Sequence, residues 1–136
     1  MVTVYVMCGV PGSGKTTQSK RMAEELGLAR FSFDEMRCIR QEEFLRPALA
    51  AMREGKSVIL DTTNLRANVR KKLLQALEGV SCRKVVVFMD TPLEECLHRN
   101  ANREAKLHER VIVSLHQSVQ KPTIDEGWDE IYISRE

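Results

Sequence analysis

Residues 9–16 read G-V-P-G-S-G-K-T, which is a complete G-x-x-x-x-G-K-T motif for binding phosphate. An apolar run, Val2–Cys8, precedes the motif, and a stretch of helix-forming residues, 16–26, follows it. This strand–loop–helix context distinguishes a phosphate-binding loop from a glycine-rich turn that happens to precede a lysine. The glycines let successive backbone N–H groups point inward at a phosphate, and the following helix adds its positive N-terminal end. The sequence therefore predicts a binding site for a nucleoside triphosphate.

The residues of this loop are expected to play different roles in binding the nucleotide. Lys15 is expected to reach the β- and γ-phosphates, and the Thr16 hydroxyl is expected to bind Mg²⁺. The contacts to ATP or another triphosphate are expected from Gly9, Pro11, Gly12, Ser13, Gly14, Lys15, Thr16 and Thr17. Magnesium is the only metal that the sequence indicates, because the histidines form no metal-ligand pattern.

Length and composition limit the remaining possibilities. With 136 residues the chain is expected to form one domain, residues 1–136. The net charge of +2 is too small to indicate a nucleic-acid partner by itself. The four cysteines are widely spaced and include no C-x-x-C pair, which favours reduced thiols in a cytoplasmic protein. No apolar run reaches transmembrane length, and the first strand leaves no room for a signal peptide, so no membrane partner is expected.

Strands and helices are predicted to alternate along the chain. Strands are predicted at residues 2–8, 30–33, 57–60, 84–89 and 131–133. Helices are predicted at residues 16–26, 34–54, 67–78, from Pro92 onward, and 109–120, with Pro47 breaking or kinking the second one. Thr91 to Glu94 has the pattern of a capping box with proline at the first helical position. The alternation predicts a three-layer P-loop NTPase fold, with a parallel five-stranded sheet and helices on both faces.

Polar residues follow the strands of this predicted sheet, at the edge where ligands of parallel sheets bind. Asp34 follows the second strand, and Arg37 lies one helical turn later, so a carboxylate and an arginine could face one cavity. The carboxylate could accept a proton from a hydroxyl and the arginine could hold a phosphate, although Asp34 could also be only a helix cap. Asp61 follows the third strand, where a carboxylate could hold a magnesium-bound water or orient the acceptor. The alternative is that Asp61 belongs to a turn that caps the following helix.

The helix that begins near Pro92 carries Arg99 and Arg103 on one face. A mobile segment bearing arginines could neutralise the charge that develops on a transferred phosphate, which would make this segment a lid. Arg99 is expected to contact the nucleotide phosphates and Arg103 to act in catalysis. Pairing of these arginines with nearby glutamates on a solvated surface is the alternative.

Several segments together resemble the polynucleotide 5′-hydroxyl kinases of the P-loop class, in particular the phage-type kinase domain. The matching segments are C-G-V-P-G-S-G-K-T-T at 8–17, F-D-E-M-R at 33–37, V-I-L-D-T-T-N-L at 58–65, R-N-A-N-R at 99–103 and E-G-W-D-E-I at 126–131. The resemblance implies that Asp34 activates the acceptor hydroxyl, that Arg37 binds the phosphate flanking the acceptor nucleoside, and that Arg103 stabilises the transferring phosphate. The polar run after the third strand is one residue longer here than in that family, so either Asp61 or Thr62 could take the inner position.

Three functional hypotheses follow. The leading one is an ATP-dependent kinase that phosphorylates the 5′-hydroxyl end of DNA or RNA, with Lys15, Asp34 and Arg103 as catalytic residues. It is favoured by the short segment between the second and third strands, which leaves the acceptor side open. The second is a kinase of the same fold that acts on a small-molecule or tRNA-linked hydroxyl. The third is a nucleotide-dependent switch without phosphate transfer, which would need no base at the position of Asp34.

Overall fold

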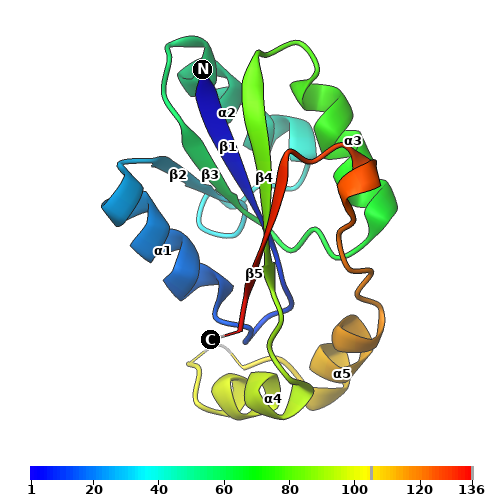
Figure 1. Cartoon of the computed structure of the whole chain (residues 1–136). Coiled ribbons are helices and arrows are strands. Elements are labelled where there is room, and N and C mark those ends of the chain that lie inside the picture. The colour runs from blue at the N-terminus through cyan, green and yellow to red at the C-terminus, as the bar shows by residue number, and fades with distance from the viewer. Residues whose placement is uncertain (105, 136) are drawn as a thin grey trace.

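The computed structural model describes residues 1–104 and 106–135. Its elements in chain order are β1 (Val2–Cys8), α1 (Lys15–Leu26), β2 (Ala29–Ser32), α2 (Gln41–Arg53), β3 (Val58–Asp61), α3 (Ala67–Leu77), β4 (Cys82–Met89), α4 (Leu93–Ala101), α5 (Glu109–Gln117), the short 3₁₀ helix η1 (Ile124–Glu126) and β5 (Glu130–Ser134). The strands form one parallel sheet in the order β2-β3-β1-β4-β5 (Figure 1). The predicted fold, a five-stranded parallel sheet with helices on both faces, is confirmed.

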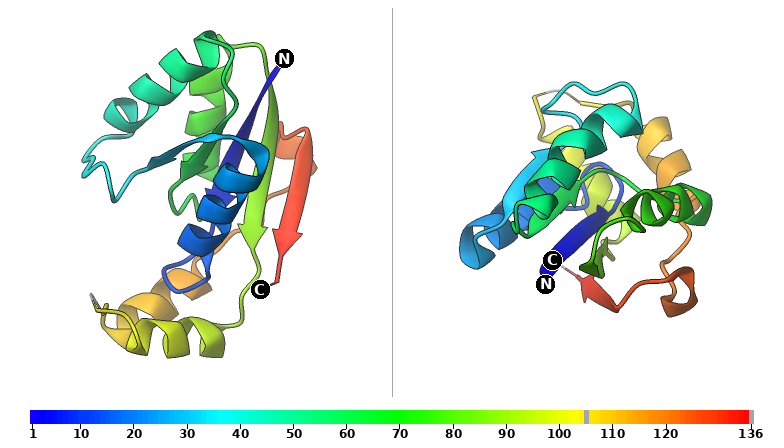
Figure 2. Two further views of the ribbon diagram at one scale, coloured as in Figure 1. Left: turned by 90° about the vertical axis from the view of Figure 1, so that its left-hand side faces the viewer. Right: turned by 90° about the horizontal axis from the view of Figure 1, so that it is seen from above.

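Each face of the sheet has its own apolar layer, because successive side chains of a strand point to opposite faces. One layer packs β1, β3 and β4 against α2 and α3, through residues such as Val6, Phe44 and Leu73. The other packs Met7, Ile59 and neighbouring residues against α1. Helices α4 and α5 lie beyond the carboxyl ends of the strands and have a small core of their own (Figures 1 and 2). The candidate site therefore lies between the sheet and this α4–α5 unit.

The segment after β2 differs from its predicted helix. Residues 34–37 form a turn, and α2 begins only at Gln41. The turn is closed by backbone hydrogen bonds from Met36 N to the Ser32 carbonyl (3.0 Å) and from Cys38 N to the Phe33 carbonyl (3.2 Å). Pro47 lies inside α2 without dividing it, so the expectation of a break at this residue is wrong and the interruption falls earlier in the segment.

The start of α4 also differs from expectation. Pro92 occupies the N-cap position rather than the first helical turn, and its own side chain makes no capping hydrogen bond. The Thr91 hydroxyl instead donates to the carbonyl of Ser13 in the phosphate loop, at 2.7 Å. The residue predicted to cap α4 therefore ties the end of β4 to the loop.

Candidate active site

The phosphate loop runs from the end of β1 to Gly14, which is the N-cap of α1. Gly12 and Gly14 have φ angles of 86° and 93°, in the left-handed region that favours glycine. Gly9 is required for space, because a Cβ at this position would lie 2.6 Å from the Ser13 hydroxyl. The sequence thus forms a tight loop in which the backbone approaches any bound phosphate closely.

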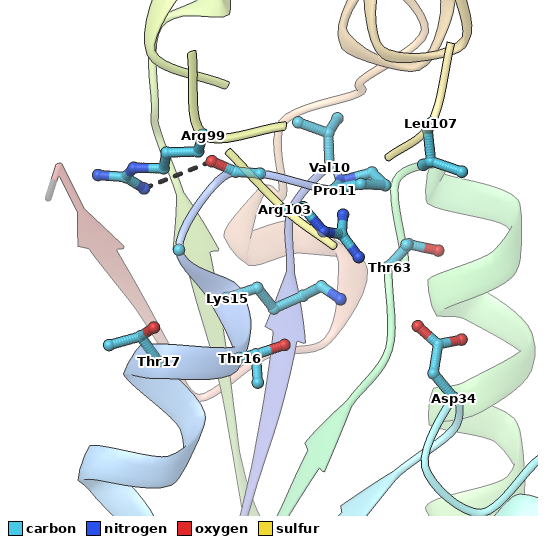
Figure 3. A pocket seen from close by; sticks show the side chains of 12 residues that line it. Val10, Pro11, Lys15, Thr16, Thr17, Asp34, Thr63, Arg99, Arg103 and Leu107 are labelled. Carbon is cyan, nitrogen blue, oxygen red and sulfur yellow. Dashed lines mark hydrogen bonds between the residues drawn. The ribbon is translucent and has the colours of Figure 1, made fainter. Parts of the chain in front are cut away.

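A cavity of about 640 Å³ opens in front of this loop (Figure 3). It is lined by Val10, Pro11, Gly12, Gly14, Lys15, Thr16, Thr17, Asp34, Thr63, Arg99, Arg103 and Leu107. Most of the residues predicted to bind the triphosphate are therefore brought together. Gly9 and Ser13 do not line this cavity, and the buried Ser13 hydroxyl has no hydrogen-bond partner among residues 1–104 and 106–135.

Asp61 is the inner residue of the polar run after β3, whereas Thr62 is partly exposed and lines a neighbouring cavity. The Lys15 ammonium lies 3.3 Å from Asp61 Oδ1. Oδ2 accepts hydrogen bonds from the Ser19 hydroxyl (2.8 Å) and from Arg30 Nη2 (2.7 Å). Burial alone would raise the pKa of Asp61, but Lys15, Ser19 and Arg30 outweigh burial and hold the pKa below its ordinary value. Asp61 is thus an ionised partner of the loop lysine.

Arg30 was not identified from the sequence. It lies in β2, and its guanidinium bridges Asp61 and Glu35, with Nη2 2.7 Å from Glu35 Oε2. The sequence feature that could have identified Arg30 is its position in the middle of a short strand of a buried parallel sheet, where an unpaired charge is costly. Its partners depend on the register of β2 against β3, which the sequence does not give.

A second cavity, of about 430 Å³, adjoins the first. Its lining residues are Lys15, Phe33, Asp34, Ile39, Gln41, Phe44, Thr62, Thr63, Asn64 and Val69. Lys15, Asp34 and Thr63 line both cavities. The exposed Asp34 side chain therefore lies on the boundary between the space in front of the phosphate loop and the neighbouring space, as Figure 3 shows from the first cavity.

Arg37 is placed away from both cavities. It is exposed, adopts a φ of 55°, and donates its backbone N–H to the Asp34 carbonyl at 3.1 Å. The prediction that it follows Asp34 by one helical turn is wrong, because this segment is a turn rather than a helix. Its expected part in binding the acceptor, like that of Asp61, stays a prediction.

The two predicted lid arginines both line the first cavity but differ in their contacts. Arg99 pairs with Glu95 at 3.2 Å, and its Nη1 donates to the Gly12 carbonyl at 3.4 Å (Figure 3). Arg103 makes no ion pair or side-chain hydrogen bond within the described part of the chain and points into the cavity (Figure 3). Asn100 ties the end of α4 to Leu107, because its side chain both donates to the Leu107 carbonyl (2.7 Å) and accepts from the Leu107 N–H (3.0 Å). No sequence pattern singled out Asn100.

Two kinds of feature are absent from the described residues. The described residues contain no group of three or more histidine, cysteine, aspartate or glutamate side chains arranged to hold a metal ion. Among these same residues no helix is both long and apolar enough to cross a membrane.

Comparison with known proteins places the chain in a family. A family model described as an AAA domain, AAA_33, matches residues 4–122. The chain therefore belongs to the AAA_33 family of P-loop kinase domains.

A protein of Methanococcus maripaludis named L-seryl-tRNA(Sec) kinase is 30% identical over 143 aligned positions, which cover 93% of this chain. The chain spans 56% of the length of that relative.

Several solved structures share the fold. A sugar kinase from Janibacter sp. HTCC2649 has a TM-score of 0.76 at 22% identity, covering 99% of this chain and 86% of that one. Chaetomium thermophilum Kti12 in complex with ADP-AlF3 has a TM-score of 0.74 at 19% identity, with coverages of 97% and 88%. A fungal RNA kinase has a TM-score of 0.73 at 18% identity, with coverages of 98% and 74%. At these identities the likeness concerns the fold alone.

Proposed function

We propose that this member of the AAA_33 family transfers the γ-phosphate of ATP to the hydroxyl of a small group, which is either a free small molecule or a group carried on a tRNA. The observation that supports this proposal is the position of Asp34, which lines both adjoining cavities together with Lys15 and Thr63. The nucleotide would occupy the cavity in front of the phosphate loop, and the acceptor would occupy the second cavity.

In this arrangement Asp34 accepts the proton of the acceptor hydroxyl while the hydroxyl oxygen forms a bond to the γ-phosphorus. The bond from the γ-phosphorus to its bridging oxygen breaks, and ADP leaves. Lys15 and the N–H groups of the loop hold the β- and γ-phosphates, and Arg103 neutralises the charge that develops on the transferring group. Thr16 lines the nucleotide cavity, and its hydroxyl would hold Mg²⁺, which would supply positive charge to neutralise the phosphates.

The lining of the second cavity favours a small acceptor over a polynucleotide end. Apart from Lys15 and Asp34, its described lining residues are apolar or neutral, and they include Phe33, Gln41 and Thr62. A terminal nucleotide would bring a flanking phosphate, and Arg37, the residue expected to bind it, lies outside this cavity. The relative named L-seryl-tRNA(Sec) kinase also supports a tRNA-linked hydroxyl as an acceptor, as an alternative to a free small molecule.

A transfer assay with ATP labelled at the γ-phosphate tests the proposal. The acceptors compared are a panel of small alcohols and sugars, seryl-tRNA, and oligonucleotides with a 5′-hydroxyl. We expect label on a small alcohol, a sugar or the seryl group, and a loss of transfer in Asp34→Asn. Preferential labelling of 5′-hydroxyl oligonucleotides would favour the polynucleotide kinase hypothesis instead. In that case a nucleoside 3′-phosphate should also be a better acceptor than the bare nucleoside, and Arg37→Ala should abolish this preference. ATP hydrolysis without transfer to any of these acceptors would support a nucleotide-dependent switch.

A further inference from the structure

Arg70 of α3 is a charged side chain with no exposed surface. Its Nε and Nη2 donate to the two carboxylate oxygens of Glu126, each at 2.9 Å. Trp128 Nε1 donates to the same carboxylate at 2.9 Å. Burial alone would lower the pKa of Arg70, but the hydrogen bonds and charge of Glu126, together with Cys8, outweigh burial and raise it. The C-terminal E-G-W segment thus holds a permanent positive charge inside the fold, where η1 packs beside α3 (Figure 1).

The remaining guanidinium nitrogen of Arg70 is directed at the active-site side of the molecule. Nη1 donates to the backbone carbonyl of Asn64 at 2.8 Å, and the Cys8 thiol donates to the same carbonyl at 3.2 Å. Asn64 has a φ of 49°, a left-handed conformation that carries a cost for a residue other than glycine. Its side chain donates to the Met7 carbonyl at 2.9 Å. The turn at Asn64 is therefore held both by Arg70 and by the end of β1.

This turn lines both cavities and is hydrogen-bonded to the phosphate loop. Thr63 lines both cavities, and Asn64 lines the second one. The Thr63 carbonyl also accepts a hydrogen bond from the Gly9 N–H, at 3.0 Å, where the phosphate loop begins. A shift of the Asn64 carbonyl would consequently move the wall of the acceptor cavity relative to the loop.

We infer that Arg70 is a positioning residue, which fixes the Asn64 turn and thereby sets the acceptor cavity against the phosphate loop. The inference rests on the proposed function for its effect on catalysis. Stability alone gives little reason for this arginine, because a buried ion pair is often replaceable by apolar residues of similar volume without loss. What such a replacement removes is the charge-assisted hydrogen bond to the Asn64 carbonyl.

The test is the paired substitution Arg70→Met with Glu126→Gln, which leaves neither charge buried alone and keeps an acceptor for the Trp128 Nε1–H. The matched control replaces an exposed pair, Arg83→Met with Glu130→Gln. We expect the first variant to unfold at nearly the same denaturant concentration as the wild type, while kcat/KM for the acceptor falls about 10- to 100-fold through misplacement of the acceptor. The affinity for ATP should change much less, and the control should change neither quantity. A wild-type kcat/KM in the first variant would overturn the inference.

Amide hydrogen exchange at Gly9 gives a second readout, which does not depend on catalysis and so separates this inference from the proposed function. In the paired variant the Gly9 amide should exchange at least about tenfold faster, while amides in the centre of β1 keep their protection. Arg70→Lys should give the same local increase, because a lysine retains the charge but cannot hold Glu126 and the Asn64 carbonyl in the fork geometry of arginine. Unchanged protection of Gly9 in both variants would overturn the inference.

Discussion

Replacing Lys15 with methionine should separate its ion pair with Asp61 from its proposed role in phosphate transfer. The Lys15 ammonium lies 3.3 Å from a carboxylate oxygen of Asp61, whose side chain is only 2% exposed. At an effective dielectric constant of about 20, two charges at this distance attract by about 5 kcal/mol before desolvation is counted. Asp61 keeps Ser19 and Arg30 in the variant, so we expect a net loss of only about 1–2 kcal/mol in the free energy of unfolding. Phosphate transfer should be abolished, because the methionine cannot contact the β- and γ-phosphates.

The pH dependence of this loss identifies its cause. Because Lys15 contributes to lowering the pKa of Asp61, its stabilisation is present above the ordinary aspartate value of 3.8 and is lost as the pH falls through the lower native value. Urea unfolding followed by the fluorescence of Trp128, the one tryptophan in the sequence, measures the loss at neutral and acid pH. Lys20→Met, an exposed site on the same helix, is the control. The reasoning is refuted if the two variants are equally stable at neutral pH, or if the difference persists at pH values below the native pKa of Asp61.

Three further predictions concern the loop, the lid and the core. Gly12→Ala should destabilise the fold by more than Gly27→Ala, because both residues have a positive φ but only the Gly12 site places a Cβ 2.6 Å from the Cys96 carbonyl; urea unfolding of the two variants measures the difference. Arg103→Ala should lower the single-turnover rate by about 10²–10³-fold with little change in ATP affinity, and an unchanged rate would show that this arginine is only a surface residue. Burial raises the pKa of Cys8 from 9.0 to about 11, so its contribution to stability is present below pH 9 and is lost, by roughly 3 kcal/mol at most, as the pH rises through 11. Cys8→Ala should remove that part of the alkaline destabilisation, as measured by unfolding across this pH range.

The phosphate loop and the parallel sheet could be predicted because each depends on local patterns. The loop motif requires its glycines at fixed spacing, and the strands show as short apolar runs separated by helical segments. The turn after β2 could not be predicted in this way, because D-E-M-R is equally compatible with the first turn of a helix. Hydrogen bonds to Ser32, including one from the Glu35 N–H to its hydroxyl at 3.3 Å, select the turn instead.

The polar pairs behind the site were missed for a different reason. Arg30 and Asp61 are 31 residues apart in the sequence, and Arg70 and Glu126 are 56 residues apart. Such pairs form only after the strands have found their register and the C-terminal segment has packed beside α3. The comparisons show a kinase domain of the AAA_33 family, which is a coarser statement than the 5′-hydroxyl kinase that the sequence first favoured.

The claim at the centre of this account is that Asp34, at the boundary of the two cavities, is the base for phosphate transfer. The most direct test is kcat of Asp34→Asn at saturating acceptor and ATP, with the acceptor that the transfer assay identifies. Asparagine preserves the size of the side chain but cannot accept the proton, so kcat should fall by about 10²–10⁴-fold while ATP affinity and the unfolding midpoint stay close to those of the wild type. A near wild-type kcat would contradict the account and leave Asp34 with only a structural part in the turn after β2.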